Sequence, residues 1–117
     1  MKINLKDKCG KDTITREDGQ TINEIIIRAW DDEEKIVIDL NNIIIASVSF
    51  FDEAFGKLAF HYSKDSLVKK LSFENINEFD RALLNDIIIS RFHHRELGKN
   101  GFSQIKKKKS ERKRAVG

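Results

Sequence analysis

An α/β fold is the class that this sequence predicts, and three observations lead to it. Short runs of β-branched and aliphatic residues alternate with longer stretches in which apolar residues recur every three or four positions. Their order is strand, helix, one or two strands, helix, strand, helix, which favours parallel strands joined by right-handed crossovers. A length of 117 residues with 39% hydrophobic residues suits one domain with a real core.

The N-terminus predicts a strand followed by a long loop. Residues 1–5 alternate apolar and polar side chains, which is typical of a strand at a sheet edge with Ile3 and Leu5 turned inward. Residues 7–20 are rich in charge and glycine and predict a loop, with a short strand near residues 13–15.

A helix and the central strand are expected next. Residues 21–24 form a capping-box pattern, and an apolar stripe runs from Ile22 to Trp30. Residues 36–40 form a short aliphatic run that predicts a central strand covered on both faces. After an Asn-Asn turn signal, the isoleucines at 43–45 are expected to carry the chain back across the core.

Ser49 is expected to open the central helix. Its hydroxyl would accept the backbone N–H of Asp52, whose carboxylate would reach back to the cap. Apolar residues then recur at helical spacing over residues 50–62 and form one broad face. The strand-to-helix junction at residues 46–53 is therefore where we expect the function of the protein to lie.

The C-terminal part predicts a strand and one more helix. Residues 67–73 suggest a helical turn that leads into a strand. A cap-like start at residues 75–78 precedes a helix that we expect to end near Arg95 or Leu97. The chain is thus divided into a domain of residues 1–97 and a basic, disordered tail of residues 98–117.

Charge is unevenly distributed along the chain. Residues 106–114 contain seven bases and one acid, hence +6, which leaves the rest at −3 because the whole chain carries +3. The bases are Lys106, Lys107, Lys108, Lys109, Arg112, Lys113 and Arg114. Such a run can contact nucleic acid through counterion release, or it can be a solubilising extension. Phe102 is its one nearby aromatic residue for stacking on bases.

The residues that could carry catalysis are few. His93 and His94 are neighbours on the last predicted helix, where side chains point about 100° apart and cannot share a face. His61 is expected to be structural, and Cys9 has no partner cysteine, so neither a disulfide nor a thiolate metal site is expected. No phosphate-binding glycine loop or nucleophile elbow occurs. We expect no enzyme, no cofactor and no metal.

The cellular location that we expect for the protein follows from similar observations. No run of about 18 apolar residues occurs, so no membrane span is expected. The first ten residues, MKINLKDKCG, lack the apolar region of a signal peptide. Together with the lone cysteine, these features favour the cytoplasm.

Two interpretations of Ser49 stay open. It is a helix cap, or it is a serine that is phosphorylated or contacts a partner, because a helix N-terminus favours an anion. Asp52 and Glu53 already place negative charge in that first turn and would repel a phosphate. Ser47 is the second candidate for phosphorylation, and Asp39 is expected to be a solvated strand end.

The same segment resembles the STAS-like domains of unknown function. The residues that carry the resemblance are Asp39-Leu40 at a strand end, Ser49-Phe50, Asp52-Glu53, and the upstream segment Thr15-Arg16-Glu17-Asp18-Gly19. The resemblance covers roughly residues 1–95. It implies a fold related to anti-anti-sigma factors, with a small mixed sheet of four to five strands and about three helices packed mainly on one face.

The resemblance also implies a function. In anti-anti-sigma factors the strand-to-helix loop docks a partner, and an ATP-binding kinase-like protein phosphorylates its second serine. Ser49 falls on that serine, while Ser47 and Phe50 depart from the aspartate and glycine of that pattern. We therefore expect a regulatory protein-binding module whose contact includes Ser49, Phe50, Asp52 and Glu53, with an ATP-binding anti-sigma or histidine-kinase-like protein as partner. The alternative is a nucleic-acid-associated protein that binds through its tail.

Overall fold

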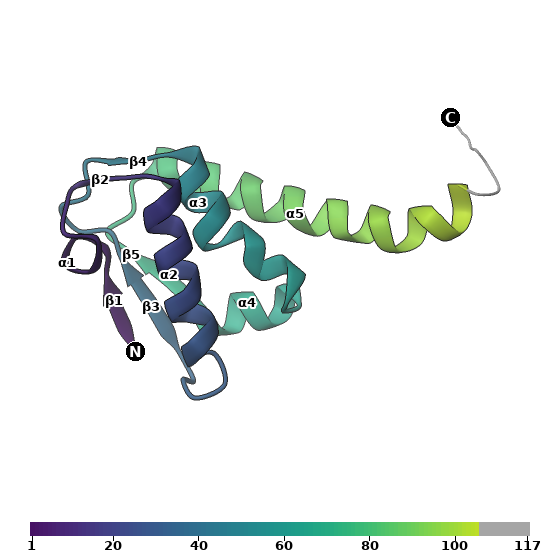
Figure 1. Cartoon of the computed structure of the whole chain (residues 1–117), viewed down its shortest axis with the longest axis horizontal. Helices are drawn as coiled ribbons and strands as arrows, with labels where there is room; N and C mark the ends of the chain where they lie inside the picture. The colour runs from purple at the N-terminus through teal and green to yellow at the C-terminus, as the bar shows by residue number, and fades with distance from the viewer. Residues whose placement is uncertain (106–117) are drawn as a thin grey trace.

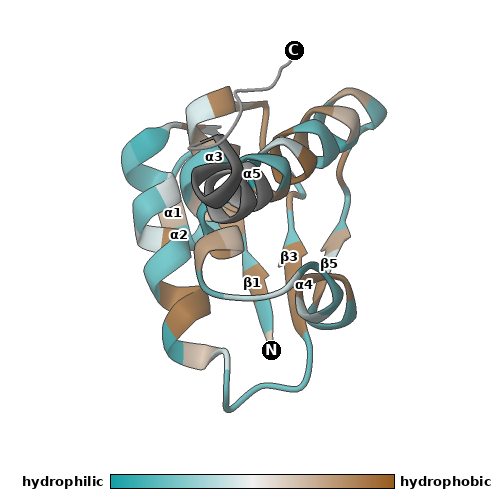
Figure 2. Ribbon diagram, turned by 90° about the vertical axis from the view of Figure 1, so that its right-hand side faces the viewer, coloured by the Kyte–Doolittle hydropathy of each residue, from teal (hydrophilic) through white to brown (hydrophobic). Residues whose placement is uncertain are grey.

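A three-stranded parallel sheet forms the centre of the fold (Figures 1 and 2). The computed structural model describes the backbone of residues 1–105 and the side chains of residues 1–94. The strands lie in the order β1-β3-β5, so β3 is central and β1 is an edge, as predicted. Their bounds are Lys2–Asn4 for β1, Ile36–Asp39 for β3 and Leu71–Glu74 for β5.

A second, smaller sheet lies beside the first one. It pairs β2 with β4, also in parallel. Their bounds are Thr13–Ile14 for β2 and Ile45–Ala46 for β4. The expectation of a single mixed sheet is therefore wrong: the described strands form two sheets, and each is wholly parallel. Short strands joined by helical crossovers make only parallel pairs here.

Helical segments connect the strands, and they are more numerous than the three that we expected (Figure 1). Their bounds are Leu5–Cys9 for α1, Arg16–Ala29 for α2, Val48–Ala54 for α3, Gly56–Phe60 for the 3₁₀ helix η1, Lys64–Lys70 for α4 and Glu78–Ile105 for α5. Within the described part of the chain, no helix is both long and apolar enough to cross a bilayer.

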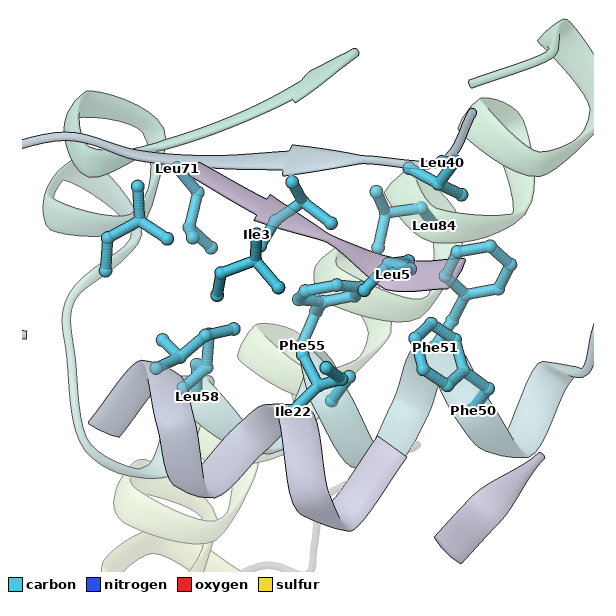
Figure 3. Packing of buried hydrophobic residues seen from close by; sticks show 14 of the residues in the cluster. Ile3, Leu5, Ile22, Leu40, Phe50, Phe51, Phe55, Leu58, Leu71 and Leu84 are labelled. Atoms are coloured by element: carbon cyan, nitrogen blue, oxygen red, sulfur yellow. The ribbon is translucent and has the colours of Figure 1, made fainter. Parts of the chain in front are cut away.

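The core lies between one face of the three-stranded sheet and the helices. Ile3 stands opposite Ile38, and Ile36 stands opposite Leu71, so these side chains share a face. Figure 3 shows this face turned toward the side chains of α2 and of the α3–η1 segment. The fully buried residues contributed by those helices include three phenylalanines, Phe50, Phe51 and Phe55.

The opposite face of the sheet is polar and partly open. Lys2 and Ser72 are exposed there, and Val37 between them is half-buried. The central strand is only partly uncovered on this face, because Val37 is half-buried and Asp39 is buried beneath polar side chains of the neighbouring segments.

Helices α2 and α3 both begin earlier than predicted, α3 at Val48. Helix α2 begins at Arg16, and the capping box is made by Thr15 and Asp18 instead of Thr21 and Glu24. Asp18 accepts the Thr15 N–H at 2.9 Å. The predicted loop at residues 7–20 therefore contains the end of α1, strand β2 and the start of α2, and only the short strand near residues 13–15 is confirmed.

The expected central helix is divided in two. Helix α3 ends at Ala54 and is followed by η1, whose last residue is Phe60. The isoleucines expected to cross the core do not do so, since Ile44 and Ile45 are largely exposed and only Ile43 packs against the core.

The last helix is longer than predicted. It was expected to end near Arg95 or Leu97, but α5 continues to Ile105, and Figure 1 shows it projecting beyond the body of the protein. The tail bases from Lys106 to Arg114 lie outside the described residues.

Candidate functional site

Ser47, not Ser49, caps helix α3. The Ser47 hydroxyl accepts the backbone N–H of Phe50 at 2.9 Å, and Ser47 has the extended backbone of an N-cap residue. The Ser47 N–H donates to the Ile14 carbonyl at 3.1 Å, which ties the cap to strand β2. The capping role predicted for Ser49 is wrong, and its half-buried hydroxyl lies in the first turn of the helix.

Two of the predicted contact residues belong to the interior. Phe50 is fully buried, and its ring packs edge-on against Phe51 with centroids 5.5 Å apart. Its side chain is out of reach of a partner, so we remove it from the proposed contact. Glu53 is also buried, and its carboxylate pairs with Lys57 at 2.7 Å, one helical turn away.

Asp52 links α3 to α5. Its carboxylate accepts two hydrogen bonds from the Arg91 guanidinium, and the one from Nε measures 2.7 Å. These bonds hold the pKa of Asp52 below its ordinary value and raise that of Arg91. Arg91 also lies over the Phe60 ring, 5.4 Å from its centroid. A bidentate pair of this kind sets the position of α3 against α5.

A groove of about 480 Å³ lies between α3 and α5. We call it the α3–α5 groove. It is lined by hydroxyl groups, by acidic and basic side chains and by two aliphatic side chains. The lining residues are Arg16, Val48, Ser49, Asp52, Glu53, Asp86, Ile87, Ser90, Arg91 and His94. Ser49, Asp52 and the buried Glu53 thus line one groove, whereas Phe50 does not reach it.

Three large apolar side chains are exposed at or just before the start of α3, and one of them, Val48, lines this groove. Ile44 is 71% exposed, Ile45 57% and Val48 58%, and all three lie at the junction of β4 and α3. We call these three residues the β4–α3 corner. A contiguous exposed apolar patch is a common mark of a protein contact.

Asp39 is a buried polar centre and not the solvated strand end that was expected. It is 6% exposed, and it accepts Asn75 Nδ2 at 2.7 Å and the Asn41 N–H at 2.9 Å. The Asn75 bond, followed by the Asn41 bond, lowers the pKa of Asp39. Lys2 and Asn4 face the same carboxylate, at 3.8 Å and 3.3 Å. Asp39 therefore ties together the carboxyl ends of β1, β3 and β5.

The remaining titratable candidates form no reactive cluster. His61, His93 and His94 are exposed. Cys9 is half-buried, and burial raises the pKa of its thiol, which disfavours the reactive thiolate. Among the described residues, no group of three or more histidine, cysteine or acidic side chains is placed to hold a metal ion.

Sequence reasoning missed the wall of the groove that α5 provides. Asp86 and Arg91 come from α5, and Arg16 comes from the first turn of α2. The α5 residues of the groove share one helical face, because their spacing follows the helical repeat at positions 86, 87, 90, 91 and 94. This spacing was the one signal in the sequence that could have grouped them. The partner of Arg91 lies 39 residues away and had no signal in the sequence.

Comparison with known proteins agrees with this fold. The family model of a STAS-like domain of unknown function matches residues 18–81, from the first turn of α2 to the first turn of α5. No curated protein and no solved structure matches the chain significantly.

Proposed function

Because the chain belongs to the family of STAS-like domains of unknown function, we propose that it is a non-enzymatic module that binds another protein through the β4–α3 corner and the α3–α5 groove. The observation that carries the proposal is the exposure of the aliphatic residues Ile44, Ile45 and Val48, of which Val48 lines a groove together with charged and hydroxyl side chains. An apolar centre with a polar border is the usual composition of a protein interface.

The surface is also held firmly in place. Helix α3 approaches α2 at Gly19, where an added Cβ would lie 2.7 Å from the Phe50 carbonyl oxygen. On its other side, the Asp52–Arg91 pair connects α3 to α5. A contact surface on packed helices loses little conformational entropy when a partner binds, which favours affinity.

Our proposed partner is an ATP-binding anti-sigma or histidine-kinase-like protein, an assignment that rests on the likeness to anti-anti-sigma factors. We further propose that phosphorylation of Ser49 weakens docking. A phosphate would add about two negative charges at pH 7 to a groove that already contains Asp52, Glu53 and Asp86. Asp52 is paired with Arg91, and Glu53 is paired with Lys57. Asp86 has no ion pair among the described residues.

Site-specific photocrosslinking tests the proposal. A photoreactive amino acid is placed at Val48, or at exposed Glu24 on α2 as a control, and crosslinked proteins from the host cell are identified. A nucleotide-binding protein captured from position 48 alone supports the proposed partner class. Capture of the same proteins from both positions, or from neither, contradicts the docking surface.

Affinity measurements with the purified partner then test the residues. Ile45→Glu and Ser49→Asp should each weaken binding by about tenfold or more, since each places a charge in a desolvated contact. The matched control is Phe79→Glu, which also replaces an exposed apolar side chain by a charge; Phe79 is 77% exposed on α5 and lines neither this groove nor the other groove of the described surface. Equal affinities for all three variants would refute the proposed surface.

A further inference from the structure

Strand β5 presents a free edge to its surroundings. It is the outer strand in the order β1-β3-β5, and Figure 2 shows it at the margin of the sheet. The Glu74 carbonyl accepts the Leu40 N–H at 3.0 Å, so Glu74 and, two residues before it, Ser72 direct their main-chain groups toward β3. Phe73 therefore directs its N–H and C=O outward. Among the described residues, neither of these groups has a hydrogen-bond partner.

An apolar groove of about 480 Å³ runs along this edge, between α4, β5 and α5. We call it the β5 groove. Leu67, Leu71 and Leu84 are buried at its base, while Val68 is 72% exposed and Ile89 is 56% exposed at its sides. Helix α5 contributes residues 81, 84, 85, 88 and 89, which lie on one face of the helix and not on the face that lines the α3–α5 groove.

The charged side chains that line the β5 groove have one sign. Lys64 and Arg81 line it, and no carboxylate does. Within the described part of the chain, the side chains of Lys64 and Arg81 take part in no ion pair or hydrogen bond, and both residues are exposed. An apolar floor with two unpaired cations complements a ligand that is apolar in the middle and acidic at its ends.

We propose that the β5 groove binds an extended segment of a partner protein, apolar in the middle and acidic at its ends, as an additional strand on β5. Such a strand would pair its main chain with the outward groups of Phe73 and place alternate apolar side chains in the groove. Its acidic ends would meet Lys64 and Arg81. This site is separate from the proposed function at the β4–α3 corner.

Charge argues against two other occupants. A second copy of the chain offering its own β5 would bring the exposed Lys69, which precedes that strand, toward the cations of the groove. The lysine-rich segment at residues 106–109 has the same sign of charge. Like charges placed opposite one another across a contact oppose binding.

Nuclear magnetic resonance with the ¹⁵N-labelled full chain tests the proposal. The probe is a synthetic nonapeptide, Asp-Glu-Val-Thr-Val-Thr-Val-Glu-Asp, added up to about 1 mM, a range suited to a short strand contact. We expect shifts of the Phe73 amide and of the amides of residues 81–89. A control peptide with lysine in place of its four acidic residues should cause much smaller shifts. Arg81→Glu should weaken binding of the acidic peptide by about fivefold, whereas Arg28→Glu, the same change on the exposed surface of α2, should not.

A third peptide isolates the main-chain pairing. N-methylation of alternate residues removes the N–H donors of the probe, and this peptide should lose binding if it adds as a strand. Equal binding of the methylated and unmethylated peptides would refute strand addition. Absence of shifts near Phe73 with the acidic peptide, equal shifts with the basic peptide, or pairing of β5 with a second copy of the chain would each overturn the proposal.

Discussion

Replacing Gly19 by alanine should destabilise the protein, although alanine is the better helix former. Gly19 lies inside α2 where this helix crosses α3. A Cβ at this position would lie 2.7 Å from the Phe50 carbonyl oxygen and 2.9 Å from the Glu53 Cβ. Two of the three nearest atoms belong to the backbone of α3, so relief requires the two helices to move apart.

The expected loss of stability in Gly19→Ala is the difference between two opposing effects. Overpacking of a well-packed contact costs about 1–3 kcal/mol, and two contacts below 3.0 Å place this site in the upper part of that range. Alanine regains about 1 kcal/mol through its higher helix propensity. The free energy of unfolding should therefore fall by about 1–2 kcal/mol, which lowers Tm by roughly 5–10 °C in a domain of this size.

Urea denaturation followed by tryptophan fluorescence measures this change. Trp30, the one tryptophan, is 6% exposed at the end of α2 and stacks on Tyr62 with ring centroids 3.9 Å apart. Gln20→Ala, at the exposed neighbouring position, is the matched control and should not destabilise the protein. If Gly19→Ala is as stable as the wild type or more so, the close packing of α2 on α3 is refuted.

Three further predictions concern the carboxylates and the tail. Asp39→Asn should lower the free energy of unfolding at pH 7 by about 1–2 kcal/mol. The pKa of Asp39 is depressed in the folded protein, so the difference in stability from the wild type should persist above about pH 4. It should shrink as the pH falls through the pKa of Asp39 in the folded state. A double-mutant cycle with Asp52→Asn and Arg91→Met should give a coupling energy of about 1 kcal/mol for this partly exposed pair. If the basic tail binds nucleic acid, deletion of residues 106–117 should abolish salt-dependent retention on DNA or RNA.

Each of these three predictions has a measurable outcome that would contradict it. For Asp39, urea titrations at several pH values that show a constant difference would mean that its ionised form is not stabilised by the fold. For the Asp52–Arg91 pair, additive single substitutions would mean that the two side chains do not interact in solution. For the tail, equal retention before and after deletion would rule out the alternative nucleic-acid function.

Much of the fold could be predicted from the sequence because its signals are local. An alternating pattern identified the edge strand around Ile3, and a short aliphatic run identified the central strand around Ile38. The helical spacing of apolar residues likewise located most of the core. These patterns depend on side-chain direction along a single element, which neighbouring residues determine.

Helix starts were less predictable because several residues compete for each cap. Thr15 and Thr21 both precede plausible helical stretches, and so do Ser47 and Ser49. The choice at α3 depends on the bond from the Ser47 N–H to the Ile14 carbonyl, which holds Ser47 in the extended conformation that a cap requires. That bond joins residues 33 positions apart, so the capping preferences of neighbouring residues cannot predict it.

By itself, the sequence determined the alternation of strands and helices, the apolar core and the segment at residues 46–53 as a candidate surface. Only the tertiary structure decided which serine caps α3, that Phe50 is buried, and that Arg91 from α5 closes the groove beside Ser49. The physical reason is distance along the chain: periodicity and capping preference act over a few residues, whereas the pairing of a carboxylate with a guanidinium 39 positions away exists only once the helices have packed.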